Sequence, residues 1–175
     1  MTDIATAFIA QSRSILMRDD LPRIERCLEK LSDEEIWWRA NDESNSIGNL
    51  LLHLNGNVRQ WIVSGLGGRP DARVRQEEFD ERRILPRAEL LKRLKETLAE
   101  ADAVLAELEP SGLLESRHIQ ADDVTVLEAI YHVVEHFSMH TGQIILLAKT
   151  LKAGEIRFYD FSSGAPVETW HEPQA

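Results

Sequence analysis

The chain has 175 residues, of which 43% are hydrophobic and 29% are charged, an ordinary balance for a globular domain that can bury a core. Its formal net charge of −10 argues against nucleic acid or an anionic membrane as a partner, because proteins bind phosphate groups through basic surfaces. The single cysteine, Cys27, excludes an intrachain disulfide.

No targeting or membrane segment is predicted. The first residues, MTDIATAFIAQSR, lack the basic start and long apolar run of a secretory signal. No apolar stretch reaches the roughly 20 residues that a transmembrane helix needs. We therefore expect a single cytoplasmic domain over residues 1–175.

The first 31 residues predict one helix, over residues 3–31, because their apolar side chains recur with helical spacing. Pro22 is expected to kink or interrupt it, since proline donates no backbone hydrogen bond. Cys27 within this helix is expected to be a small buried hydrophobic residue rather than a nucleophile.

Two capping boxes mark the starts of later helices. In such a box the first and fourth side chains each bond a free backbone N–H of the other residue. Ser32 and Glu35 form one that begins a short helix, and Thr125 and Glu128 form another that begins a helix over residues 125–152.

The remaining segments complete the predicted architecture. Apolar stripes predict helices over residues 46–65 and 86–109. A connection of mixed charge, residues 65–86, and a loop, residues 113–123, separate the helices, and the tail, residues 153–175, is not helical. The sequence predicts an all-α four-helix bundle with a short extra helix and a non-helical tail that packs on the bundle or is partly mobile.

Three histidines on the last helix are the first candidate functional residues. His132, His136 and His140 are four residues apart and therefore lie near one another on one side of the helix. At about 100° per residue, His140 is roughly 40° from the centre of the apolar stripe, His136 about 80° and His132 about 120°. We expect His136 and His140 to bind a metal, with hydrogen-bonded core histidines as the alternative.

His53 lies on the flank of the helix over residues 46–65, with Asn49 and Asn57 one turn to either side. On the residues alone it is either a rim histidine or a metal ligand supported by amide side chains. His118, in a loop, is expected to be exposed, and His171, near the end of the chain, is expected to be mobile rather than a ligand.

Two segments together resemble a known family. IGNLLLHLNGNVRQWI around His53 and EHFSMHTGQIILL around His136 and His140 are similar to the DinB/YfiT-like superfamily of metalloenzymes. That family is a four-helix bundle with one histidine on its second helix and two, four apart, on a later helix. The later pair commonly ends in His-x-Gly-Gln, which HTGQ, from His140 to Gln143, matches. Thr141 occupies the position where many members have arginine.

The resemblance implies a divalent metal, Zn²⁺ or Ni²⁺, held by His53, His136 and His140. It implies a metal-dependent enzyme acting on a small-molecule substrate, either a thiol-dependent S-transferase that uses a low-molecular-weight thiol or a hydrolase. Asn57 and Gln143 are the candidates for hydrogen-bonding the ligands. A homodimer is also implied.

Three alternatives remain at this stage. The run HVVEH, from His132 to His136, matches the inverted zinc-protease motif, in which both histidines bind zinc and Glu135 is the general base. Glu135 is also the only weak catalytic candidate of the three-histidine site. The chain can instead be a non-catalytic, dimeric bundle that binds a metal or ligand, or a bundle that has lost its metal.

Overall fold

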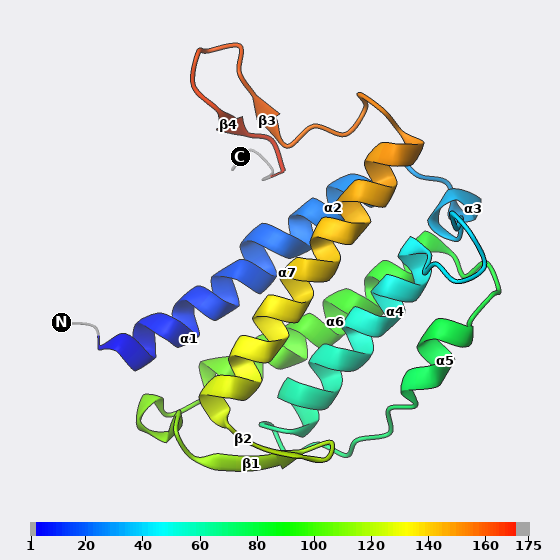
Figure 1. Cartoon of the computed structure of the whole chain (residues 1–175). Helices are drawn as coiled ribbons and strands as arrows, with labels where there is room; N and C mark the ends of the chain where they lie inside the picture. Colours follow the sequence, from blue (N-terminus) through cyan, green and yellow to red (C-terminus); the bar gives the residue numbers. More distant parts are fainter. Residues whose placement is uncertain (1–2, 171–175) are drawn as a thin grey trace.

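The computed structural model describes residues 3–170, and its main feature is a set of long helices packed side by side (Figure 1). The predicted all-α bundle is confirmed. Its helical runs are α1 (Ile4–Ser14) with η1 (Ile15–Asp20) and α2 (Leu21–Leu28), α4 (Ile47–Val58) with η2 (Arg59–Ser64), α6 (Arg87–Ala106), and α7 (Val126–Leu151).

Pro22 does not break the first helical run. The π-helical segment η1 ends at Asp20, two residues before the proline, and the N–H of Leu21 bonds to the carbonyl of Leu16, five residues back. This wider turn shifts the hydrogen-bond register where Pro22 can donate nothing, and the run continues to Leu28. The expected interruption therefore takes the form of a π-helical segment.

Short elements fill the segments between the long helices. The Ser32–Glu35 capping box begins α3 (Asp33–Ile36), as predicted. Two segments predicted as loops contain regular structure instead. The connection over residues 65–86 contains the helix α5 (Arg75–Asp80). The loop over residues 113–123 follows the 3₁₀ turn η3 (Pro110–Gly112) and contains most of an antiparallel hairpin of β1 (Ser116–Ile119) and β2 (Asp122–Thr125).

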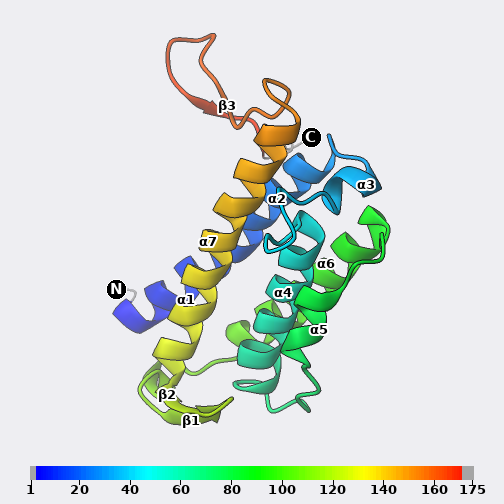
Figure 2. The ribbon, with the colours of Figure 1, turned by 45° about the vertical axis from the view of Figure 1, so that its right-hand side comes forward.

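The tail is non-helical, as predicted, and its residues up to 170 pack on the bundle. A small hairpin of β3 (Tyr159–Asp160) and β4 (Val167–Glu168) lies beyond the end of α7 (Figure 1), and Figure 2 shows β3 there from another side. Phe158 and Trp170 are buried, and the guanidinium of Arg23 lies 4.5 Å from the centre of the Trp170 ring. The expectation for His171 lies outside the described residues.

The core is built from the apolar stripes of the long helices. Ile24, Leu54, Leu94 and Phe137, one from each run, are fully buried. Among the described residues, no helix is both long and apolar enough to cross a bilayer. The buried stripe of α7, which includes Phe137, packs on the other helices, and this orientation places His136 beside His53 of α4.

Asp20, the last residue of η1, has a buried carboxylate that contacts α7. It accepts a 2.6 Å hydrogen bond from the Ser138 hydroxyl, and the guanidinium of Arg23 is 3.5 Å away. Burial raises the pKa of Asp20, and these two contacts offset the effect only in part. Ionised Asp20 is therefore less favourable in the folded protein than in the unfolded chain.

We predict that Asp20→Asn raises the melting temperature at pH 7, with a gain that disappears in acid. A raised folded-state pKa contributes stability below the unfolded pKa, and this contribution is lost as pH rises through the folded value. Melting curves from pH 3 to 8 measure the effect, with exposed Asp42→Asn as the control. A variant that is less stable at pH 7 would show that the ion pair with Arg23 dominates.

Candidate metal centre

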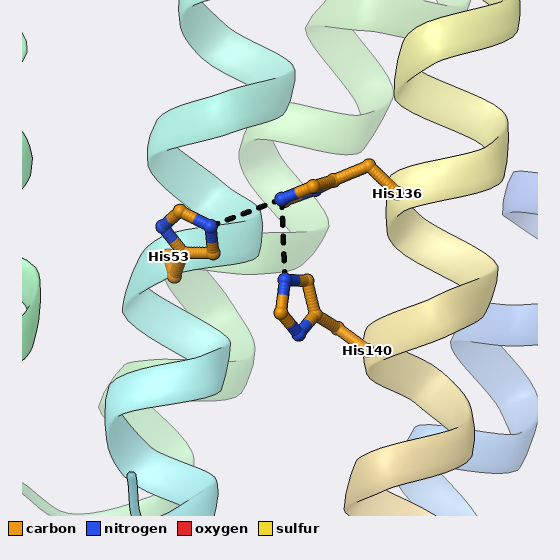
Figure 3. Close-up of side chains that lie close together, drawn as sticks. All are labelled: His53, His136 and His140. Atoms are coloured by element: carbon orange, nitrogen blue, oxygen red, sulfur yellow. Dashed lines mark hydrogen bonds between the residues drawn. The ribbon is translucent and has the colours of Figure 1, made fainter. Parts of the chain in front are cut away.

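α4 and α7 face one another and bring three imidazoles together between them (Figure 3). His53 comes from α4, whereas His136 and His140 come from successive turns of α7. The Nε2 atom of His136 lies 3.0 Å from Nε2 of His53 and 3.1 Å from Nε2 of His140. One candidate ligand atom from each residue lies within 4.8 Å of the other two.

Hydrogen bonds at the far side of two rings determine where their lone pairs point. Nδ1 of His53 lies 2.8 Å from a carboxylate oxygen of Glu78, which can only accept, and 3.2 Å from Nη2 of Arg73, which can only donate. Because the contact with Glu78 is shorter and Nη2 already donates to Glu78 at 2.9 Å, the hydrogen is assigned to Nδ1. Nδ1 of His140 lies 2.7 Å from the amide oxygen of Gln143 and carries its hydrogen because that oxygen can only accept. With the hydrogen at Nδ1, the neutral form of each ring presents a lone pair at Nε2 to His136.

His136 cannot satisfy both neighbours by itself. Its Nε2 carries at most one hydrogen, so at least one of its two short contacts joins a pair of lone pairs. Burial first, and the neighbouring histidines next, lower the pKa of His136 to about 3, so the ring is neutral near pH 7. Its Nδ1 is buried and has no hydrogen-bond partner among the described residues. This donor set fits a cation, which accepts all three lone pairs at once.

The carboxylate behind His53 comes from the short helix α5. Glu78 is buried and receives two hydrogen bonds from Arg73, from Nε at 2.7 Å and from Nη2 at 2.9 Å. Burial alone would raise the pKa of Glu78, but the bonds from Arg73 and His53 outweigh burial and hold the pKa below its usual value. Glu78 is therefore ionised at neutral pH.

Comparison with known proteins finds one family model that matches most of the chain. The family model described as Protein of unknown function (DUF1572) matches residues 3–164, which include all four helical runs and the three histidines. The chain belongs to this family. No curated protein matches the chain significantly.

The other candidate residues of the DUF1572 chain do not belong to the group of three converging nitrogens, although the ring of His132 stacks on that of His136 with centres 5.5 Å apart. Nδ2 of Asn57 is 3.2 Å from Nε2 of His132, so Asn57 supports that ring rather than His53, His136 or His140. His132 also packs on Trp61, with ring centres 4.2 Å apart. Glu135 is exposed. This arrangement favours the three-histidine set over the inverted zinc-protease motif.

Two further positions have simple structural roles. Thr141 is buried, and its hydroxyl donates a 2.9 Å hydrogen bond to the carbonyl of Phe137. This position faces the core, and the cation beside the histidines is Arg73 instead. His118 is exposed, as expected, and its Nδ1 lies 2.8 Å from a carboxylate oxygen of Asp123.

Sequence reasoning missed Glu78 and Arg73. Both belong to the segment over residues 65–86, where alternating charges are equally typical of a solvated connection. The one signal in the sequence was the length of this segment, since long connections in compact domains are often functional. The role of Gly56 was also missed. Its lack of a side chain leaves room for the ion pair, because a Cβ atom there would lie 2.0 Å from Oε1 of Glu78 and 2.8 Å from Nε of Arg73.

We predict that Gly56→Ala displaces the Glu78 carboxylate and loosens α5. The added methyl group would occupy the space that the ion pair of Glu78 with Arg73 now fills. Amide hydrogen exchange of residues 70–82 should accelerate, while exchange in the centre of α6 should not. Gly142→Ala is the matched control, because nothing lies within 4 Å of a Cβ there. Unchanged exchange around α5 in Gly56→Ala would contradict the prediction.

Proposed function

We propose that this protein is a metal-dependent enzyme that holds one divalent ion, Zn²⁺ or Ni²⁺, through Nε2 of His53, His136 and His140. The observation that carries the proposal is the convergence of three imidazole nitrogens, of which two have lone pairs fixed by partners at Nδ1. Three neutral imidazoles suit these ions and leave at least one coordination position for another ligand.

The residues of the chain keep this site neutral and oriented. Burial lowers the pKa of both His136 and His140, so protons do not compete with a metal near pH 7. Gln143 fixes the His140 ring from the same helix, and Glu78 fixes His53. A bound divalent ion would supply a nucleophile at neutral pH, because it lowers the pKa of a coordinated water or thiol.

The reaction class that we favour is thiol-dependent S-transfer to a small-molecule substrate. The resemblance to the DinB/YfiT-like superfamily supports it, and the state of Cys27 indicates where the thiol would come from. That thiol, the only one in the chain, is fully buried, and burial raises its pKa to about 12. A thiol nucleophile must therefore come from outside, as a low-molecular-weight thiol. A cytoplasmic homodimer belongs to the same proposal, and hydrolysis is the alternative reaction.

A second candidate function is a non-catalytic bundle that binds a metal or ligand. It is favoured by the lack of a free acid–base group beside the histidines in the described part of the chain. Glu78 is held by Arg73, and Glu135 is exposed on α7. Such a protein would bind metal and catalyse no turnover.

Metal content tests the proposal directly. We expect near-stoichiometric metal in untagged wild-type protein, and none in His140→Ala, because two imidazoles cannot complete the site. His118→Ala, at an exposed histidine outside the site, is the matched control and should keep its metal. Retention in His132→Ala would also exclude the inverted zinc-protease motif. Wild-type protein that binds neither Zn²⁺ nor Ni²⁺ on incubation would refute the proposal.

Metal removal should also lower stability. An ion at about 100 times its Kd stabilises the folded state by about 2.7 kcal/mol, and a chelator removes this contribution. For a chain of this length we expect the melting temperature to fall by roughly 5–10 °C. The His140→Ala variant should show no response to the chelator. An unchanged melting temperature in the wild type would support a bundle that has lost its metal.

Turnover separates the two candidate functions. We expect the metal-loaded protein to couple a low-molecular-weight thiol to at least one electrophile of a screening panel, and His140→Ala to have no such activity. Loss of free thiol measures the reaction, with metal-free wild-type protein as the control. Full metal loading without turnover across the panel, including ester and amide substrates, would favour the non-catalytic bundle.

A further inference from the structure

We propose that Glu78, clamped by Arg73, is the positioning residue of the centre, and that it holds His53 with its Nε2 lone pair directed at the metal. The inference rests on the proposed metal site and extends it to a segment that contributes no ligand. On this proposal α5, which lies on the outer side of α4 in Figure 1, contributes to the metal centre by orienting one of its ligands.

The first argument is that every oxygen of the Glu78 side chain has a partner. Oε2 lies 2.8 Å from Nδ1 of His53 and 2.9 Å from Nη2 of Arg73, while Oε1 lies 2.7 Å from Nε of Arg73. The Glu78 residue is 8% exposed. The planar fork of arginine determines the plane of the carboxylate, and the carboxylate in turn determines the orientation of the imidazole.

The second argument is that Arg73 and α5 are themselves held from several sides. Nη1 of Arg73 donates a 2.9 Å hydrogen bond to Gln60, whose amide donates a 2.6 Å bond to Asp71. On the other side, Nδ2 of Asn49 donates a 2.8 Å bond to the backbone carbonyl of Glu78. Contacts from α4 and η2 therefore fix both ends of the Arg73–Glu78 pair.

The third argument concerns charge. A carboxylate that accepts from Nδ1 of a ligating histidine fixes the tautomer and raises the basicity of Nε2. A buried carboxylate without a cation would be strongly unfavourable, and the guanidinium removes that penalty. The pair is neutral as a whole, so three neutral imidazoles and a divalent ion keep a net positive charge. That charge favours an anionic additional ligand, such as a thiolate or hydroxide.

The competing explanation is that Glu78 has a purely structural role and only anchors α5 to α4. It predicts that any variant with a docked α5 binds metal like the wild type. The positioning role predicts that loss of the carboxylate charge weakens the site even in a folded protein. Metal affinity and the His53 ring proton therefore separate the two explanations.

The test compares Glu78→Gln with Glu77→Gln, the exposed neighbour on the same helix. We expect Glu78→Gln to bind Zn²⁺ about 10–100-fold more weakly, in competition with a chromophoric chelator, and Glu77→Gln to match the wild type. In Zn²⁺-loaded protein, the NMR resonance of the Nδ1 proton of His53 should be far downfield in wild type and Glu77→Gln. It should move upfield in Glu78→Gln.

Arg73→Lys keeps the proposal testable if Glu78→Gln fails to fold. It retains a cation but removes the fork, so we expect an affinity between those of wild type and Glu78→Gln. Wild-type affinity in folded Glu78→Gln or folded Arg73→Lys, with His53→Ala devoid of metal, would overturn the positioning role and leave the metal site intact. An equal loss in Glu77→Gln would also overturn it. Wild-type protein without metal affinity would overturn both.

Discussion

The constraint on which the centre depends is the shortage of hydrogens among three converging imidazole nitrogens. His53 and His140 each present a lone pair, because their Nδ1 hydrogens are engaged by Glu78 and Gln143. His136 lies between them, and its low pKa leaves it neutral. A hydrogen-bonded core would avoid this arrangement, since lone pairs in contact repel one another. The arrangement is favourable when a cation is shared, and this is the physical basis of the proposed function.

The two fixed imidazoles depend on support of different origins. Gln143 lies three residues after His140 on α7, so helical geometry alone brings the two side chains together. Glu78 lies 25 residues after His53 and reaches it only because α5 docks on α4, through contacts that include Arg73 and the close approach at Gly56. Half of the support is therefore local, and the other half requires the folded tertiary structure.

This difference explains how much could be predicted from the sequence. Helical periodicity and capping boxes predicted the long helices, and the spacing of His136 and His140 predicted a pair on one face. His53 remained ambiguous on the residues alone, because a flank position on α4 becomes buried only when α5 covers it. Asn57 was expected beside the metal ligands, but it bonds His132, since the spacing of residues does not fix the direction of a side chain. The hairpin β1–β2 and α5 carry too short a pattern to be distinguished from loops.

The position of Thr141 shows why charge near the centre must be considered in three dimensions. In the sequence, Thr141 occupies a position where many members of the family that the chain resembles have arginine, and this difference would remove a cation from the site if the position faced the histidines. In the structure this side chain is buried and bonds the carbonyl of Phe137, so it does not face the histidines. The nearby cation is Arg73, but its guanidinium already donates hydrogen bonds to Glu78, from Nε, and to Gln60, from Nη1. In a chain with a net charge of −10, the attraction for an anionic reactant at this centre would have to come from the proposed metal ion.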